Sequence, residues 1–148
     1  MIYKNELNLE FSSLSENESF ARSCVASFCL PLNPSIETIT DIKTAVSEAV
    51  TNCVVHAYPN GVGVVQINVK LCNKQIYISV KDFGVGIKDV SKAKEPFYTS
   101  KPESERSGMG FTVMESFMDS VTVTSKIGVG TEVVLIKNLE DVTVAVGG

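Results

Sequence analysis

The sequence predicts an α+β fold, a two-layer α/β sandwich in which a mixed sheet carries helices on one face. Short segments with apolar residues at alternate positions indicate strands, and longer segments with apolar residues every three or four positions indicate helices. No repeat or low-complexity linker divides the 148 residues. We therefore expect one domain over residues 1–140, followed by a disordered tail over residues 141–148.

The N-terminal half is predicted to form one strand and two helices. The strand covers residues 5–11, where every second residue is apolar. Apolar residues spaced four apart predict a helix over residues 16–30. A second helix begins at Asn33 and Pro34, with Asn33 as its cap and Pro34 at the first helical position. Its apolar stripe continues until Pro59 breaks it.

The C-terminal half is predicted to form most of the sheet. Its elements are a hairpin with strands over residues 65–71 and 76–80, a helix over residues 110–119, and strands over residues 121–126 and 131–136. Residues 88–109 show no sustained period and contain lysines, prolines and serines. An irregular stretch of this length in a compact domain is typical of a functional lid or of disorder.

Composition and charge exclude several classes of protein. The net charge of −4 and the pI near 5.0 argue against a nucleic-acid surface. No apolar run reaches the roughly 20 residues of a membrane span, and the first residues lack the apolar core of a secretory signal. Cys24, Cys29, Cys53 and Cys72 lie in apolar stretches without metal-ligand spacing, which indicates buried thiols in a reducing cytoplasm.

A polar stripe runs along the second predicted helix. Glu48 and Asn52 lie four residues apart and so face the same side, away from the apolar stripe. The carboxylate could accept a proton, and the amide oxygen could complete the coordination of a Mg²⁺ ion that arrives bound to phosphates. For these two residues alone, an ordinary solvated face is the favoured interpretation. His56, at the end of the stripe, is more typical of a turn residue bonded to backbone.

Two glycine-containing loops add to this stripe. Asp82 ends a predicted strand and is followed by Gly84 and Gly86, so a carboxylate stands where the backbone can approach a planar ring. The adenine amino group is one donor that such a carboxylate accepts. A plain loop with glycines at positive φ is an equally good interpretation of this short pattern.

The second loop precedes the helix predicted from residue 110. Unpaired amides at a helix N-terminus favour phosphate, and Lys101 and Arg106 lie just upstream. The residues of this loop are Ser107, Gly108, Met109, Gly110 and Phe111. A flexible hinge is the alternative interpretation, and neither glycine loop matches a Walker A or dinucleotide fingerprint.

The order of these motifs resembles the Bergerat-fold (GHKL) superfamily of ATPases and kinases, which includes histidine-kinase catalytic domains, gyrase and MutL. The resemblance spans about residues 4 to 138. It is closest to the anti-sigma F factors of spore-forming bacteria, on the segments FSSLSENESFAR, SEAVTNCVVHAY, FYTSKPESERSGMGF and MESFMDSV. That family consists of serine kinases that sequester the sporulation sigma factor sigma F.

The resemblance implies a role for each motif residue. It implies that Glu48 is the catalytic base, that Asn52 is the Mg²⁺ ligand and that Asp82 binds adenine in a pocket shaped by Gly84 and Gly86. It further implies that the phosphates of ATP or ADP are held by Ser107, Gly108, Met109, Gly110 and Phe111 under a lid that includes Lys101 and the charge-balancing Arg106. Thr131 matches an adenine-side contact, and Glu18 and Arg22 match the surface that meets protein partners.

We therefore expect a cytoplasmic homodimer that binds sigma F and phosphorylates a serine of an anti-anti-sigma protein, with no nucleic-acid or membrane partner. Three alternatives stay open at this point. A sibling kinase for a stress-response sigma factor has the same nucleotide motifs. A histidine-kinase fragment needs a phospho-accepting histidine on a dimerisation helix. A nucleotide-dependent binding module without phosphoryl transfer has less use for both Glu48 and Asn52.

Overall fold

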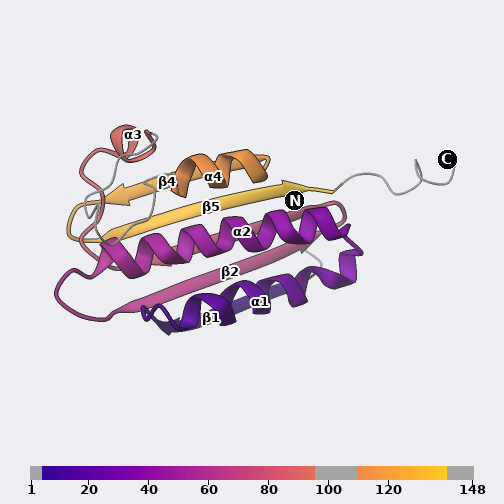
Figure 1. Cartoon of the computed structure of the whole chain (residues 1–148), viewed down its shortest axis with the longest axis horizontal. Coiled ribbons are helices and arrows are strands. Elements are labelled where there is room, and N and C mark those ends of the chain that lie inside the picture. Colours follow the sequence, from indigo (N-terminus) through magenta and orange to yellow (C-terminus); the bar gives the residue numbers. More distant parts are fainter. Residues whose placement is uncertain (1–4, 96–109, 140–148) are drawn as a thin grey trace, which may run out of the picture.

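The computed structural model describes residues 5–95 and 110–139, which form one sheet covered by helices on one side (Figure 1). The five strands lie in the order β1-β2-β3-β5-β4. Their bounds are β1 (Asn5–Ser12), β2 (Val64–Cys72), β3 (Gln75–Asp82), β4 (Ser120–Lys126) and β5 (Gly130–Asn138). The predicted two-layer α+β sandwich is therefore confirmed.

Every neighbouring pair of these strands is antiparallel, so the expectation of a mixed sheet was wrong. Alternation of apolar residues identifies a strand but says nothing about the direction of its partner. Two tight connections, between β2 and β3 and between β4 and β5, make those pairs antiparallel. Strand β5 then lies beside β3, which places the start of β5 next to the end of β3.

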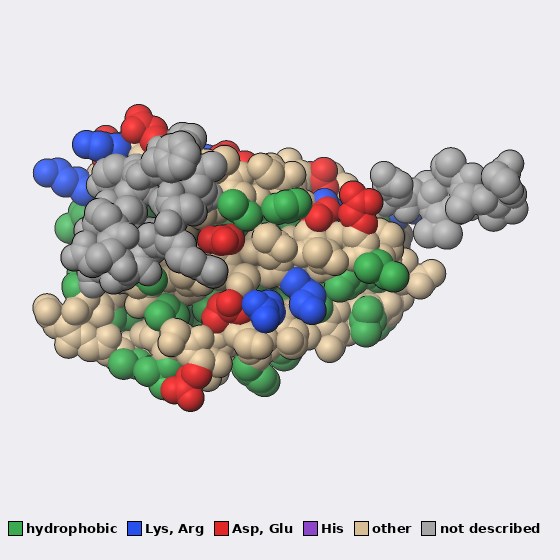
Figure 2. All heavy atoms as spheres, in the orientation of Figure 1, with side chains coloured by type: hydrophobic (Ala, Val, Ile, Leu, Met, Phe, Trp, Pro, Cys, Tyr) green, Lys and Arg blue, Asp and Glu red, His purple; other side chains and the backbone are tan. Residues whose placement is uncertain are grey.

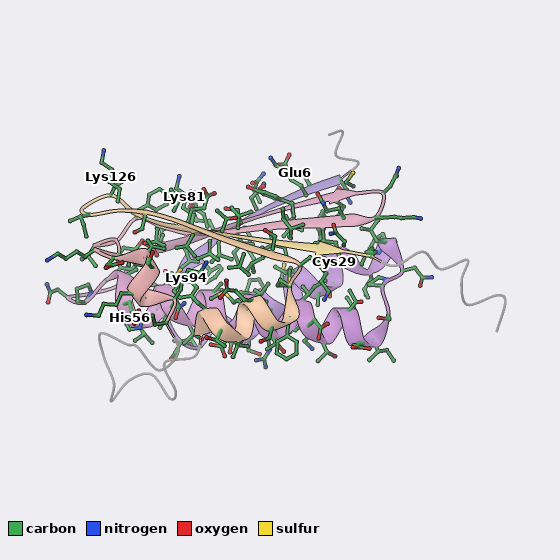
Figure 3. All side chains as sticks on the ribbon, turned by 90° about the horizontal axis from the view of Figure 1, so that it is seen from above. Glu6, Cys29, His56, Lys81, Lys94 and Lys126 are labelled. Carbon is green, nitrogen blue, oxygen red and sulfur yellow. The ribbon has the colours of Figure 1, made fainter. Side chains whose placement is uncertain are left out.

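The second layer consists of helices that pack on one face of the sheet, as the perpendicular view shows (Figure 3). Their bounds are α1 (Asn17–Cys29), η1 (Leu30–Leu32), α2 (Ile36–Asn52), η2 (Cys53–Ala57), α3 (Val90–Ala93) and α4 (Gly110–Phe117). No helix among the described residues is long and apolar enough to cross a lipid bilayer. The face drawn in Figure 2 carries mixed acidic and basic side chains rather than a surface of one sign.

The core lies between the two layers and consists of small and branched apolar side chains. The sheet contributes alternate residues of its central strands, which include Ile67, Ile78 and Leu135, each at most 1% exposed. Helix α2 contributes Ile42 and Val46, which are fully buried. All four cysteines are free thiols, of which Cys29 and Cys53 are buried while Cys24 and Cys72 are only partly so.

The N-cap of helix α2 lies two residues later than predicted. Ser35 is its N-cap, and its hydroxyl accepts a hydrogen bond from the Thr38 amide at 3.0 Å. Asn33 instead ends η1 in the left-handed region, with φ of 54°. Asparagine is favoured both as a helix N-cap and in the left-handed position that ends a helix, so the residue type alone did not distinguish the two.

A partly buried ion pair joins the helices to the sheet near the far end of the molecule. Lys137 Nζ, on β5, lies 3.1 Å from Asp41 Oδ2 on α2. The same ammonium donates to the carbonyl of Phe117, the last residue of α4, at 2.6 Å. Lys137 thus holds α2 and the C-terminal end of α4, where the helix dipole favours a positive charge.

Candidate functional site

A cavity with a volume of about 290 Å³ opens between the end of α2, the β3–α3 loop and the start of α4. It is lined mainly by apolar side chains with a few polar groups, as small-molecule sites usually are. Its lining residues are Ala49, Asn52, Cys53, His56, Ala57, Val80, Asp82, Val85, Gly86, Ile87, Lys88, Ala93, Gly110, Phe111, Thr131 and Val133.

The first part of the site lies where α4 begins against α2. A Cβ atom placed on Gly110 would stand 3.3 Å from Asn52 Oδ1 and 3.4 Å from Glu48 Oε2. These side chains, four residues apart on one helix face, therefore meet the N-terminal end of a second helix. The arrangement puts a carboxylate and a carboxamide beside amides that lack partners within α4. Such a junction suits a phosphate group and a proton acceptor next to it.

Asn52 carries a buried polar atom that no other described residue satisfies. Among the described residues, the Nδ2 atom of Asn52 has no hydrogen-bond partner although it is shielded from solvent. A native protein seldom leaves such an atom unpaired without a functional reason. A carboxamide can present its NH₂ group to a phosphate oxygen or, after a half turn, its oxygen to a cation. The residue therefore fits the environment of a nucleotide and its Mg²⁺ ion.

The second part of the site is a buried carboxylate at the end of β3. Asp82 is 5% exposed, and its Oδ1 atom accepts hydrogen bonds from the amides of Gly84 at 3.0 Å and Thr131 at 3.2 Å. Thr131 reaches this position because it pairs with Asp82 across β3 and β5. The second carboxylate oxygen keeps lone pairs for a donor on a ligand.

The cysteine next to Asn52 contacts the same carboxylate. Burial raises the pKa of Asp82, while hydrogen bonds from the Gly84 amide, the Cys53 thiol and the Thr131 amide act in the opposite direction. Burial, together with the adjacent Asp82 carboxylate, raises the pKa of the Cys53 thiol well above its ordinary value. Cys53 therefore stays protonated and acts as a donor to Asp82 rather than as a nucleophile.

Two glycines allow the loop after β3 to run close to other backbone segments. A Cβ atom on Gly84 would collide with the carbonyl of Ala57, to which the Val85 amide donates at 2.9 Å. Gly86 has a φ of 80°, in the region that favours glycine. These contacts press the loop against η2 on one side and the β4–β5 turn on the other, and so shape the cavity wall beside Asp82.

Tyr58 holds this loop from the far side. Its hydroxyl accepts a hydrogen bond from the Phe83 amide at 2.8 Å and donates one to the Val64 carbonyl at 2.7 Å. Burial raises the pKa of the Tyr58 phenol, so it remains protonated and able to donate. Sequence reasoning missed this residue, because an aromatic side chain after a helix is usually a core residue.

The structure brings together most of the residues predicted from sequence. Asn52, Asp82, Gly86, Gly110, Phe111 and Thr131 all line the cavity, with Glu48 and Gly84 directly beside it. Lys101, Arg106, Ser107, Gly108 and Met109 lie outside the described residues, as does the predicted tail. Glu18 and Arg22 lie on α1, where Arg22 Nη1 is 3.1 Å from Glu18 Oε2.

His56 and Lys88 are cavity residues that the sequence did not assign. His56 lies on the cavity wall, although a turn residue bonded to backbone was the favoured interpretation. Figure 3 shows it on the helix side of the sheet. Its spacing of four from Asn52 was a usable signal. Lys88 carried no sequence signal that would assign it to a cavity, because a lysine in a loop is ordinarily a solvated residue.

Comparison with known proteins identifies the family. The histidine kinase-like ATPase domain family matches residues 11–137. Anti-sigma F factors of Bacillus velezensis and Bacillus subtilis (strain 168) are each 53% identical over 137 residues, which cover 92% of this chain and 94% of theirs. The anti-sigma F factor of a Clostridium botulinum strain (Eklund 17B) is 53% identical over 133 residues, covering 89% and 93%.

A solved structure shows the same fold at low identity. The RsbU and RsbW domains of a Mycobacterium tuberculosis protein superpose with a TM-score of 0.67 and 18% identity. That alignment covers 92% of this chain and 33% of the other. An ATPase-domain family implies nucleotide binding, and Asp82 lines a cavity of mainly apolar side chains. This chain belongs to the histidine kinase-like ATPase domain family and, within it, to the anti-sigma F factors.

Proposed function

We propose that this chain is a cytoplasmic anti-sigma factor that binds sigma F, keeps it from RNA polymerase core, and inactivates an anti-anti-sigma protein by phosphorylating one of its serines with ATP. The observation that carries the proposal is the meeting of Glu48, Asn52 and Gly110 beside a cavity that Asp82 also lines. The strong similarity to anti-sigma F factors supports the choice of partners.

The nucleotide lies with its base against Asp82 and its phosphates at the start of α4. Asp82 accepts the adenine amino group, with Thr131 beside it, and the apolar wall covers the faces of the ring. Gly110 and Phe111 offer amides to the phosphates. The residues directly before them in the sequence, Ser107, Gly108 and Met109, extend this cradle, and Lys101 and Arg106 supply positive charge near the γ-phosphate.

The reaction transfers the γ-phosphoryl group to a serine hydroxyl. The bond from the serine oxygen to phosphorus forms as the bond between phosphorus and the β–γ bridging oxygen breaks, and ADP leaves. Glu48 accepts the hydroxyl proton. Asn52 holds the metal–phosphate end of the nucleotide in place, and Arg106 balances the developing charge. The chemistry that Mg²⁺ supplies when bound with the nucleotide is neutralisation of charge on the phosphate oxygens.

The direct test uses Glu48→Gln, which removes the base but keeps the shape of the side chain. Purified wild type and variant are incubated with radiolabelled ATP, Mg²⁺ and the candidate anti-anti-sigma protein, and phosphoserine is mapped. We expect the variant to bind ATP but to lose at least about 100-fold in phosphorylation rate. Glu37→Gln, on the exposed first turn of the same helix, is the matched control. An unchanged rate in Glu48→Gln removes Glu48 from the mechanism.

The partner surface is on α1, around Glu18 and Arg22. Their side chains are partly buried, 38% exposed for Arg22 and 23% for Glu18, and Phe20, between them in sequence, is 55% exposed. An i,i+4 pair near the surface of a helix contributes at most about 1 kcal/mol to folding, so its loss should leave the fold intact. Arg22→Ala should therefore weaken sigma F capture in a pull-down without changing ATP binding. Preferential capture of a stress-response sigma factor would instead favour the sibling kinase.

The chain acts as a homodimer. Side chains such as those of Glu6 and Lys81 project from the sheet face opposite the helices (Figure 3), which the described helices do not cover. Acidic Glu6 and Glu10 lie on β1, whereas basic Lys70 and Lys81 lie on β2 and β3. This face therefore carries charges of both signs, which a second copy related by a two-fold axis can pair with its own. Light scattering on the purified protein tests this, and a monomer at micromolar concentration refutes it.

A further inference from the structure

Backbone amides of the loop after Asp82 each donate to a separate partner. These bonds, with their donor–acceptor distances, are Phe83 to the Tyr58 hydroxyl (2.8 Å), Gly84 to Asp82 Oδ1 (3.0 Å), Val85 to the Ala57 carbonyl (2.9 Å) and Ile87 to the Ser125 hydroxyl (2.7 Å). Phe83 lies between the residue that carries the carboxylate and the residue whose amide holds it. The Tyr58 hydroxyl therefore fixes the backbone on which the orientation of the Asp82 carboxylate depends.

The direction of both hydrogen bonds at Tyr58 is determined by its partners. The Phe83 amide can only donate, and the Val64 carbonyl can only accept. The phenol therefore uses its single hydrogen for Val64, at 2.7 Å, and a lone pair for Phe83. One hydroxyl thus joins the first residue of β2 to the residue that follows β3, and removal of its oxygen breaks both bonds.

The segment that carries Tyr58 is itself anchored to the rest of the fold. The Gly63 amide donates to the Ser13 hydroxyl, and the Ser13 amide donates to the Gly63 carbonyl, each at 2.9 Å. Gly63 also provides the space for the phenol ring, because a Cβ atom at this position would collide with Cε1 and Cζ of Tyr58. A methyl group on residue 63 would therefore displace the ring and, with it, both hydrogen bonds of the hydroxyl.

We propose that Tyr58 is a positioning residue for Asp82, which holds the Phe83 backbone where the carboxylate can meet the amino group of an adenine. The inference rests on the nucleotide site of the proposed function and adds a residue that controls how strongly this site recognises the amino group of the base. Tyr58 is not among the residues that line the cavity, so it acts through the loop backbone rather than by contact with the ligand.

ATP and purine riboside 5′-triphosphate test this inference, because the second nucleotide differs only in carrying a hydrogen in place of the amino group at position 6. Their dissociation constants are measured by calorimetry on the full chain with Mg²⁺. Tyr58→Phe keeps the ring and removes both hydrogen bonds. We expect the ratio of the purine riboside triphosphate to the ATP dissociation constant to fall at least about threefold. Gly63→Ala, which displaces the ring, should lower the same ratio.

Matched controls separate this role from a general loss of structure. Tyr77→Phe removes a tyrosine hydroxyl on the face of β3 opposite the buried residues, and Gly61→Ala adds a methyl group that meets open space in the same connection as Gly63. Both should leave the ratio unchanged. In an Asp82→Asn background, Tyr58→Phe should no longer alter the ratio, because the carboxylate that it positions is gone.

The results that overturn the inference are distinct from those that overturn the nucleotide site. The inference fails if Tyr58→Phe weakens both nucleotides by the same factor or weakens neither. It also fails if the wild type binds the two nucleotides equally, because the amino group then has no partner to position. In each of these cases ATP binding by the wild type still supports the site, whereas a wild type that binds neither nucleotide overturns both.

Discussion

Replacement of Asp82 by asparagine separates the stability of this protein from its ability to bind a nucleotide. The change keeps the size of the side chain and removes one charge. Asn Oδ1 can still accept from the Gly84 and Thr131 amides, which lie 3.0 and 3.2 Å from Asp82 Oδ1. The NH₂ group then takes the place of the oxygen that faces the ligand. The adenine amino group, which is a donor, then faces the NH₂ group of the substituted side chain, which is also a donor, instead of a carboxylate oxygen.

The expected loss of affinity follows from that exchange. A hydrogen bond to a charged group contributes about 1.5–3 kcal/mol, and removal of one partner leaves the other unpaired in a buried site. This corresponds to a rise of about 10- to 150-fold in the dissociation constant of ATP. Calorimetric titration of wild type and variant with ATP and Mg²⁺ measures it directly.

The effect on stability has the opposite sign. Burial raises the pKa of Asp82 in the folded protein, so the folded state holds this proton more tightly than the unfolded chain does. The stabilising contribution is complete below the ordinary aspartate pKa and is lost as the pH rises through the raised pKa. At pH 7 the ionised, buried carboxylate is therefore a net cost to folding without ligand. Asp82→Asn should be at least as stable as wild type at pH 7, with a smaller advantage near pH 4.

Urea denaturation without nucleotide at both pH values tests this difference, with Asp89→Asn as control. Asp89 is an exposed N-cap of α3, where asparagine serves equally well, so neither stability nor affinity should change. A loss of more than about 1 kcal/mol in the Asp82 variant at pH 7 would show that the hydrogen bonds to the carboxylate outweigh the cost of its burial. ATP affinity within twofold of wild type refutes the role of Asp82 in binding the base.

Two further substitutions test the packing that supports the site. Lys137→Met removes both the ion pair with Asp41 and the hydrogen bond to the last carbonyl of α4, and should lower the free energy of unfolding in urea by about 1–3 kcal/mol. Asp41→Asn removes only the ion pair and should lower it by less. Equal losses of stability in the two variants would show that the carbonyl contact contributes nothing. Gly84→Ala places a Cβ atom against the carbonyl of Ala57, so it should destabilise the protein by about 1–3 kcal/mol and weaken ATP binding. Gly61→Ala is the control, because its Cβ atom meets open space and should change neither stability nor ATP affinity. Wild-type ATP affinity in Gly84→Ala would show that the loop position does not shape the base pocket.

The strands and most helices could be predicted because their periods are local. Alternation in residues 65–71 and 76–80 identified β2 and β3 to within two residues at each end. The apolar stripe of the second helix continued to residue 58, yet α2 ends at Asn52 and the next five residues form a π-helical turn. A single π-helical turn of five residues is too short for a period of apolar residues to distinguish it from an α-helix.

The candidate site was predictable only in part. Glu48 and Asn52 were found together because one helix turn separates them, and Asp82 with Gly84 and Gly86 because they adjoin in sequence. Tyr58 and Ser125 were not found. The hydroxyl of each accepts a hydrogen bond from the backbone amide of a residue far away in sequence, Phe83 for Tyr58 and Ile87 for Ser125.

The chain alone determined which residues form helices and strands, which faces are apolar, and which chemical groups stand one helix turn or one loop apart. These properties depend on steric preferences and spacing within a few residues. Tertiary structure decided the antiparallel order that puts Thr131 beside Asp82, and the packing of α4 on α2 that brings Gly110 to Glu48 and Asn52. Those contacts join residues about 50 or more positions apart, and their geometry depends on how whole layers pack, which no local pattern encodes.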